Sequence, residues 1–434
     1  MSGAALDTIV APATPVGRSA LAIVRIDGPA AFFLLSSLAV LPPVRQATHL
    51  SLRYDGELLD DAVVVRYAAP HSFTGNDLVE LTLHGNPLLI SRVVSACVAL
   101  GARMAEPGEF TERAVLNGKL DLVQAESIAD LINVRTTLQA KLSLGNLEGM
   151  LSRTAAAIRE SLLFVISRLE AALDFAEEGY DFISRAEARG RVEAALEQVR
   201  SLADTYRRGH ATAHGLSAVI LGRPNAGKST LLNRLVGSDR AIVTPIPGTT
   251  RDIVRETIEI GGLPVTLADT AGLRDSADPV EGIGISRARD AARSADIILY
   301  LVDAAAGWTA EDESFPNALV IYTKTDLAPA PPGELGISVT AESGIADLLA
   351  RLDGLVRERF VAAEGSLVNE RQSLAVAACA DALQESLQAL DAGYEEQMIV
   401  VDLYRASNAL GLLTGAITRD EVFAEIFSKF CIGK

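Results

Sequence analysis

One stretch of eight residues has the composition and spacing of a phosphate-binding loop. Residues 222–229 read Gly-Arg-Pro-Asn-Ala-Gly-Lys-Ser and match G-x-x-x-x-G-K-[ST] at every fixed position. In such a loop the backbone N–H groups turn inward around a phosphate, Lys228 adds a positive charge, and the Ser229 hydroxyl can bind Mg²⁺. The sequence therefore predicts a nucleotide site, with phosphate contacts from Asn225, Ala226, Gly227, Lys228, Ser229 and Thr230.

Two later stretches have residues that could close around a γ-phosphate. Residues 247–252 read Pro-Gly-Thr-Thr-Arg-Asp, and Thr250 could reach Mg²⁺ and the γ-phosphate as part of a first switch. Residues 269–272 read Asp-Thr-Ala-Gly, where Asp269 suits an outer-shell role toward Mg²⁺ and the Gly272 N–H suits the γ-phosphate. Thr270 and Ala271 complete this predicted second switch.

A third stretch has the chemistry to recognise a base. Residues 323–326 read Thr-Lys-Thr-Asp, and Asp326 would accept hydrogen bonds from the donor edge of guanine. Adenine lacks those donors, so a pocket built on Asp326 should reject it. Taken singly, each of these short motifs is more often a loop than a site. Their order along the chain predicts a GTP site that includes Thr323, Lys324 and Asp326.

These motifs need a sheet to bring them together, and the apolar runs supply its strands. Each motif follows an apolar run or lies between two, with helical patterns in the intervening chain. This alternation predicts a doubly wound parallel sheet with the nucleotide at the carboxyl ends of its strands. The expected strands are 216–221, 263–268, 297–303, 318–322 and 337–340.

The rest of the chain divides by texture. Residues 1–118 combine short β-rich runs with two helical patterns and predict an α+β domain. Residues 119–212 and 365–434 are rich in Ala, Leu, Glu and Arg at helical spacing, and neither looks self-sufficient as a bundle. We therefore expect a discontinuous helical domain whose two parts pack together, with the α/β nucleotide-binding domain, 213–364, inserted between them.

Composition sets limits on the compartment and on partners. The formal net charge of −17 opposes broad, non-specific nucleic-acid binding. Cys97, Cys379 and Cys431 are too few and too scattered for a disulfide framework or a metal site. No apolar run approaches the roughly 20 residues of a membrane span, and no signal peptide is visible. These observations predict a cytoplasmic, reduced protein.

Motifs outside the nucleotide segments resemble the bacterial MnmE (TrmE) family of tRNA-modification GTPases. The resemblance covers nearly the whole chain and is more specific than the phosphate loop, because a generic GTPase would not carry these flanking motifs. It implies a homodimer with a folate-binding N-terminal domain. The residues that carry it include Asp7-Thr8-Ile9-Val10-Ala11, Ser72-Phe73-Thr74-Gly75, Pro107-Gly108-Glu109-Phe110-Thr111-Glu112-Arg113-Ala114, Leu116-Asn117-Gly118-Lys119 and the terminal Phe430-Cys431-Ile432-Gly433-Lys434.

The resemblance also implies a reaction and partners. Working with MnmG (GidA), a partner that carries FAD, the protein would add an aminomethyl or carboxymethylaminomethyl group to C5 of the wobble uridine of certain tRNAs. The one-carbon unit would come from a tetrahydrofolate derivative (5-formyl or 5,10-methylene). By position, Arg25, Glu80, Lys119 and Lys434 would contact the folate. Cys431 matches a family cysteine thought important for modification.

The residues around the second switch leave a gap in the hydrolytic machinery that the resemblance fills. Leu273 stands where a Ras-type mechanism has a glutamine, so water must be oriented by another group. The family pairs its Ras-like domains around K⁺, which replaces an arginine finger. Glu281 matches the switch glutamate of the family. The resemblance therefore implies that Glu281 is catalytic together with Lys228. The implied K⁺ ligands are Asn225, Thr244, Ile246 and Thr249, and Thr244 and Thr249 would also line the GTP site.

Two departures from the family pattern affect base binding. Thr323 stands where the family usually has Asn, and a threonine hydroxyl can replace only part of its contacts. Residues 339–342, with the predicted contacts Thr340 and Ala341, stand where the family prefers Ser-Ala-Lys. We expect weakened, micromolar or poorer GTP affinity. The alternatives are a GTP-dependent ribosome-assembly switch of the Era or Der type and an unrelated ATPase, which Asp326 disfavours.

Overall fold

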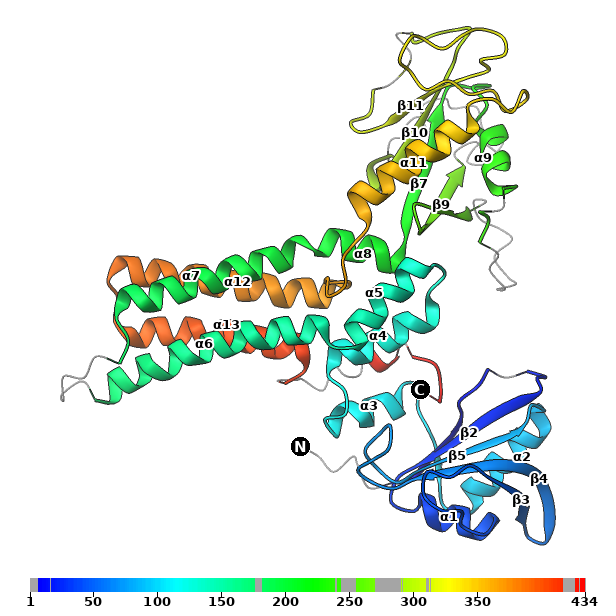
Figure 1. The fold of residues 1–434 in the computed structure, drawn as a ribbon, viewed down its shortest axis with the longest axis vertical. Helices are drawn as coiled ribbons and strands as arrows, with labels where there is room; N and C mark the ends of the chain where they lie inside the picture. Colours follow the sequence, from blue (N-terminus) through cyan, green and yellow to red (C-terminus); the bar gives the residue numbers. More distant parts are fainter. Residues whose placement is uncertain are drawn as a thin grey trace. The chain divides into compact units, whose positions relative to one another are not determined.

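A computed structural model describes residues 7–15, 17–175, 182–238, 240–242, 255–269, 290, 292–309, 312, 314–416, 426–428 and 430–433. The chain divides into two compact units, which are described separately. One unit contains Met1–Ala129 with Ser407–Lys434, and the other contains Asp130–Ala406. Figure 1 shows the elements of both units coloured along the sequence.

The first unit contains a six-stranded sheet in the order β3-β4-β5-β2-β1-β6. Helices α1 and α2 pack on one face of this sheet and form an apolar core with it. The short helix α3 follows β6. The bounds are β1 Ile9–Pro12, β2 Leu21–Asp27, α1 Ala31–Leu38, β3 Thr48–Tyr54, β4 Glu57–Tyr67, β5 Leu78–His84, α2 Pro87–Ala99, β6 Arg103–Met104 and α3 Glu109–Leu116.

The alternation of side chains along β2 and β5 gives this sheet two different faces. Val24 and Leu81 are fully buried in the core beneath the helices. Successive side chains of a strand point to opposite faces, so Arg25 and Glu80 belong to the other face. The antiparallel register pairs Arg25 directly with Glu80.

The second unit begins with helices contributed by two separate parts of the chain. Arg189 of α7 pairs with Asp391 of α12 at 2.8 Å, and the Tyr404 hydroxyl of α13 donates to Glu170 of α6. Figure 1 shows α7 beside α12 and α6 beside α13. The helical domain is therefore discontinuous, as predicted. The bounds are α4 Leu122–Asn133, α5 Thr137–Leu147, α6 Met150–Asp174, α7 Arg185–Asp204, α8 Tyr206–His214, α12 Glu370–Ala392 and α13 Glu396–Thr414.

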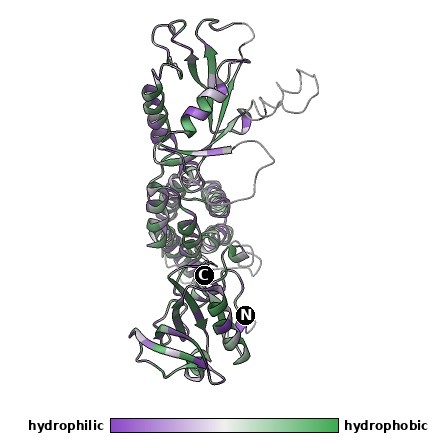
Figure 2. Cartoon of the chain, turned by 90° about the vertical axis from the view of Figure 1, so that its right-hand side faces the viewer, coloured by the Kyte–Doolittle hydropathy of each residue, from purple (hydrophilic) through white to green (hydrophobic). Residues whose placement is uncertain are grey.

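Between α8 and α12 lies a second sheet, in the order β11-β10-β7-β9-β8. The pairs β7–β9, β7–β10 and β10–β11 are parallel, whereas β8 runs antiparallel to β9. Its central strands are almost continuously apolar (Figure 2). Both faces of the sheet are buried, with α9 and α11 contributing to the core on one face and Ala292 and Phe315 to the core on the other. The bounds are β7 Leu216–Gly222, α9 Lys228–Val236, β8 Arg255–Ile260, β9 Leu263–Asp269, β10 Ile297–Asp303, β11 Leu319–Thr323 and α11 Ile345–Phe360.

The chain enters and leaves this α/β domain at neighbouring positions. The Thr212 hydroxyl in α8 donates to the Phe360 carbonyl at 3.0 Å and accepts from the Ala362 N–H at 2.9 Å. A few residues away, the Thr205 hydroxyl accepts from the Leu367 N–H at 3.1 Å. The two connections to the helical domain are therefore joined by side-chain hydrogen bonds.

Most of the expected strands are present, but one is not. Residues 337–340, predicted as a strand, make only isolated bridges, in which Gly336 pairs with Tyr322 and Ser338 with Ser343. The expectation was wrong because the chain turns back on itself immediately, with the Ser338 hydroxyl accepting from the Ala341 N–H. The strands β3, β6 and β8 were not anticipated. Among the described residues, no helix is both long enough and apolar enough to cross a bilayer.

Candidate functional site

The predicted phosphate loop connects β7 to α9, as the motif requires. Gly222 ends β7 with φ 138°, and a Cβ there would collide with the Leu301 carbonyl of the neighbouring strand. Asn225 and Gly227 also have positive φ, 62° and 90°. This left-handed backbone is costly for most residues but tolerated by glycine and asparagine. The glycine spacing of the motif therefore has a direct geometric cause.

The lysine of this loop is held by backbone oxygens. Lys228 Nζ donates to the Gly222 carbonyl at 2.9 Å and to the Arg223 carbonyl at 2.7 Å. These bonds hold the ammonium group at the loop, at the N-terminus of the nine-residue helix α9. A helix N-terminus with a fixed ammonium group is a favourable place for a phosphate.

The residues that would hold Mg²⁺ fit the ion where the structure describes them. Ser229 lies in the first turn of α9 and is exposed. β9 ends at Asp269, whose Cα pairs with Ile220 of β7, so both strands end at the same edge of the sheet. Hydroxyl and carboxylate oxygens are ligands that Mg²⁺ prefers.

Several predicted residues lie outside the part that the structure describes. These residues are Thr244, Ile246, Thr249, Thr250, Thr270, Ala271, Gly272, Glu281 and Lys434. For Asp269 only the backbone is described. The roles expected of all these side chains therefore remain predictions.

The base-recognition residues gather near the carboxyl end of β11. Asp326 Oδ1 accepts a hydrogen bond of 2.5 Å from the Ser338 hydroxyl, and Ser338 is fully buried. Lys324, whose φ is 57°, donates to Asp303 at 2.7 Å, and this hydrogen bond lowers the pKa of the Asp303 carboxyl. The Ser338 hydroxyl therefore orients the carboxylate of Asp326.

Ser338 was missed by the sequence reasoning, which selected Thr340 and Ala341 in the same turn. In the structure the Ala341 N–H donates to Ser338, and the Thr340 hydroxyl lies 3.3 Å from the Ser338 hydroxyl. Ser338 directly follows the fully buried Ile337, but nothing local in the sequence marks it as a partner of Asp326. Ser338 is therefore the residue of this turn that contacts Asp326.

Thr323 retains one of the two contacts expected of the usual asparagine. Its hydroxyl donates to the Ala226 carbonyl at 2.8 Å, and the side chain is buried. It thereby connects β11 to the phosphate loop. A hydroxyl has one donor, whereas an amide has two, so Thr323 cannot use a second donor toward the base.

Changing Thr323 to Asn is expected to tighten GTP binding by about 3- to 10-fold, the contribution of one added hydrogen bond. The Asn amide can donate both to Ala226 and toward the base. Titration with a fluorescent GTP analogue measures the change. Thr323→Val is the matched control, because it leaves the Ala226 carbonyl without this donor and should weaken binding. Unchanged affinity in Thr323→Asn would contradict this account of the weakened pocket.

In the first unit, four of the residues around the predicted folate contacts lie together. Arg25 Nε donates to Glu80 Oε1 at 2.8 Å, and the Arg25 guanidinium carbon lies 5.4 Å from the ring centroid of Phe73. The Tyr67 hydroxyl lies 3.5 Å from Glu80 Oε2, and burial, together with Glu80, raises the Tyr67 pKa. Both charged side chains are about one-fifth exposed. Of the three guanidinium nitrogens of Arg25, only Nε makes a hydrogen bond to the described part of the chain. The two η nitrogens can therefore bind an anionic or carbonyl group.

The C-terminal segment packs against this same unit. The Gly108 N–H donates to the Cys431 carbonyl at 3.4 Å, and Ile432 forms a bridge with Pro107. A Cβ at Gly433 would collide with the Pro12 carbonyl. Since Pro12 pairs with Val24, the residue next to Arg25, the segment approaches the Arg25 strand from its β1 side. Cys431 is exposed there.

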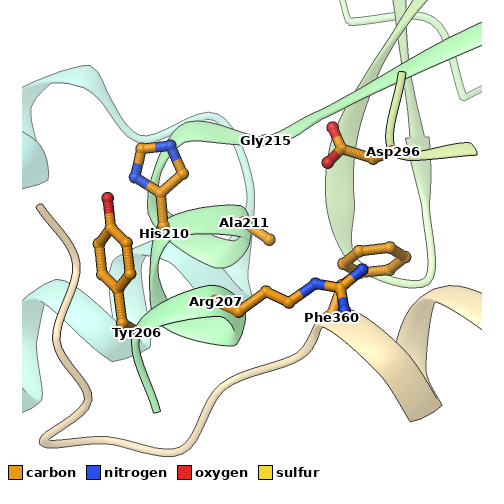
Figure 3. Close-up of a pocket in the computed structure, with 7 residues that line it drawn as sticks. All are labelled: Tyr206, Arg207, His210, Ala211, Gly215, Asp296 and Phe360. Carbon is orange, nitrogen blue, oxygen red and sulfur yellow. The ribbon is translucent and has the colours of Figure 1, made fainter. Parts of the chain in front are cut away.

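A cavity of about 250 Å³ lies at the other end of β7 from the phosphate loop (Figure 3). The Arg207 guanidinium lies 5.8 Å from the ring centroid of Phe360, and Asp296 already accepts two hydrogen bonds from Ser217. β7 runs from Leu216 to Gly222, so the cavity lies roughly 20 Å from the phosphate loop. The cavity is therefore distinct from the nucleotide site.

Comparison with known proteins matches most of the chain to one family. The family model "GTP-binding protein TrmE N-terminus" matches residues 8–119, and the model "MnmE helical domain" matches residues 122–431. The chain belongs to the MnmE family. A protein named tRNA modification GTPase MnmE from Koribacter versatilis is 40% identical over 450 residues, covering 99% of each chain. The Aquifex aeolicus protein of the same name is 38% identical, covering 99% of this chain and 100% of the relative.

Part of the chain also resembles solved structures. The FeoB G-domain from Methanococcus jannaschii is 22% identical and covers 33% of this chain and 98% of that chain, with a TM-score of 0.24. The assignment to the MnmE family does not depend on it. The predicted fold class, an α+β domain, a discontinuous helical domain and an inserted Ras-like P-loop domain, is confirmed.

Proposed function

We propose that this protein is a K⁺-stimulated GTPase that, as a homodimer with MnmG, modifies C5 of the wobble uridine of certain tRNAs. GTP hydrolysis in tRNA modification is the activity of the family to which the chain belongs. The added group would be aminomethyl or carboxymethylaminomethyl, and its one-carbon unit would come from a tetrahydrofolate derivative. The observation that carries the proposal is that one chain combines a guanine-type nucleotide site with a separate Arg25–Glu80 pair.

The residues of the nucleotide site divide the work of binding and hydrolysis. Lys228 and the α9 N-terminus neutralise phosphate charge, and the Asp326 carboxylate, oriented by Ser338, selects guanine. Glu281 would orient the attacking water through a second water. Bound Mg²⁺ and K⁺ would supply positive charge that stabilises the negative charge on the phosphate oxygens during hydrolysis. Ser229 and Thr250 would hold Mg²⁺, and Asn225, Thr244, Ile246 and Thr249 would hold K⁺.

The Arg25–Glu80 site has the groups that a folate needs. A carboxylate such as Glu80 accepts hydrogen bonds from the amino-pyrimidine edge of a pterin, and the η nitrogens of Arg25 can donate to a carbonyl or a carboxylate. Lys119 lies beside the turn that contains Phe73, because a Cβ on Gly75 would lie 3.4 Å from Lys119 Cε. Cys431 and Lys434 belong to the C-terminal segment that packs beside the Arg25 strand. Bound folate would supply the carbon that is transferred.

The test is complementation of a strain that lacks the protein, followed by mass spectrometry of wobble uridines. The unchanged chain should restore the modified nucleoside. Arg25→Ala should retain GTP hydrolysis but lose the modification, and Lys228→Ala should lose both. Arg53→Ala, at an exposed arginine of the same sheet, is the matched control and should behave as the unchanged chain. Full modification with Arg25→Ala would contradict the folate role, and loss of ribosome assembly with normal uridines would favour an Era-type or Der-type switch.

A further inference from the structure

The loop between β4 and β5 is fixed by hydrogen bonds to side chains of its own. The Ser72 hydroxyl donates to the Asn76 carbonyl at 2.5 Å and accepts from the Gly75 N–H at 2.9 Å. The Thr74 hydroxyl accepts from the Asn76 N–H at 3.2 Å. Residues 72–76 therefore form a turn with a defined internal structure, which can hold its side chains in place.

A buried carboxylate fixes this turn from below. Asp27, at the end of β2, is fully buried and accepts hydrogen bonds from the Thr74 hydroxyl, from Asn76 Nδ2 at 3.0 Å and from Arg113 at 3.1 Å. Burial raises the pKa of the Asp27 carboxyl in spite of these donors. A buried carboxylate is costly unless its oxygens are hydrogen-bonded, so losing one donor should disturb the whole turn.

Asn117, the C-cap residue of α3, holds the turn from a second side. Its Nδ2 donates to the Thr74 carbonyl at 2.7 Å and to Asn76 Oδ1 at 3.1 Å. The contact is close at Gly75, where φ is 85° and a Cβ would lie 3.0 Å from the Asn117 Cβ. The turn is thus held between β2 and the end of α3.

Two of the proposed folate contacts depend on where this turn lies. Phe73 packs on the core formed by Ile9 and Phe110, and its ring lies beneath the Arg25 guanidinium. Gly75 lies beside the Lys119 side chain. A shift of the turn would therefore move both the ring that supports Arg25 and the surface along which Lys119 extends.

We propose that Thr74, Asp27 and Asn117 are positioning residues of the folate site, which hold the 72–76 turn so that Phe73 orients Arg25 toward the ligand. This inference rests on the proposed folate role of Arg25 and Glu80. The three residues act through the turn and need not touch the ligand. Binding that depends on them is binding to a preorganised site.

The test is calorimetric titration of the full-length protein with 5-formyltetrahydrofolate. Thr74→Val keeps the shape of the side chain but removes the donor to Asp27 and the acceptor for Asn76, so affinity should fall about 10-fold or more. Thr74→Ser keeps the hydroxyl and should bind within about 3-fold of the unchanged chain. Asn117→Ala should resemble Thr74→Val. GTP affinity should be unchanged in all three variants.

Two further measurements separate positioning from loss of structure. Asn146→Ala is the matched control, because Asn146 is a buried asparagine of the helical domain whose Nδ2 donates to the Ser366 carbonyl. It should lower thermal stability and leave folate affinity unchanged. In an Arg25→Ala background, Thr74→Val should cause little additional loss, since it acts through Arg25.

Equal affinity of Thr74→Val, Asn117→Ala and the unchanged chain would overturn the positioning role. So would a Thr74→Val loss of the same size with and without Arg25, because the effect would then not pass through Arg25. If the unchanged chain binds no 5-formyltetrahydrofolate, the folate site itself is wrong and the positioning role is wrong with it. A failure of the proposed function is therefore distinguishable from a failure of this inference alone.

Discussion

Changing Asp326 to Asn is expected to lower GTP affinity by about 10²–10⁴-fold and to create affinity for XTP. The carboxylate can accept two hydrogen bonds from guanine, and each charge-assisted bond contributes about 1.5–3 kcal/mol. An amide presents one donor and one acceptor to the same edge, which matches xanthine. Titration with fluorescent GTP, XTP and ATP analogues measures the change. The bond from Ser338 to Asp326 should keep the new amide in the same plane as the carboxylate.

The control for this experiment is Asp347→Asn, at an exposed carboxylate in the first turn of α11. It removes the same charge from the same domain without approaching the base site, and GTP affinity should not change. ATP binding to the unchanged chain as tightly as GTP would show that Asp326 does not read the base. The fold would stand, but the guanine assignment would not.

Exchange of K⁺ for Na⁺ is expected to slow GTP hydrolysis by a factor on the order of 10³. Leu273 cannot orient water, and an arginine finger is worth about 10³–10⁵ in rate, so a comparable charge must come from another source. Asn225→Ala should remove the response to K⁺, because Asn225 is exposed in the phosphate loop and has a side-chain oxygen that suits an alkali cation. Hydrolysis at fixed GTP, measured against alkali-ion identity and protein concentration, is the assay.

Asn233→Ala is the matched control, since Asn233 is exposed on α9 but lies outside the loop. It should retain the full response to K⁺. If two copies meet around the ion, the rate per chain should also rise with protein concentration until the dimer is saturated. Equal rates in K⁺ and Na⁺, or full activity in chains kept monomeric, would remove the ion from the mechanism.

The phosphate loop could be predicted from the sequence because its residues are adjacent and each has its own geometric reason. Gly222 has no room for a Cβ, and Lys228 lies within reach of two loop carbonyls. The contact between Ser338 and Asp326 was missed because the two residues lie in different turns, 12 positions apart, which only the fold brings together. Local patterns contain no information on such a pairing.

The N-terminal site shows the same limit more clearly. Arg25 and Glu80 are 55 positions apart, and only the register of β2 against β5 makes them partners. The Asp27 carboxylate gives no sign in the sequence of being fully buried. The sequence likewise does not indicate how the C-terminal segment packs, where the Pro12 carbonyl leaves no space for a Cβ on Gly433.

The hydrogen bonds of Thr212 to Phe360 and Ala362 have a consequence for the order of folding. α7 and α12 must find each other across the whole inserted domain, and the entropy lost in closing a loop increases with the logarithm of its length. If the inserted domain forms first, its two ends already meet, and the remaining open chain is roughly tenfold shorter. The closure cost then falls by about 2 kcal/mol. Folding of the inserted domain would thus bring the two parts of the helical domain close enough to pack together.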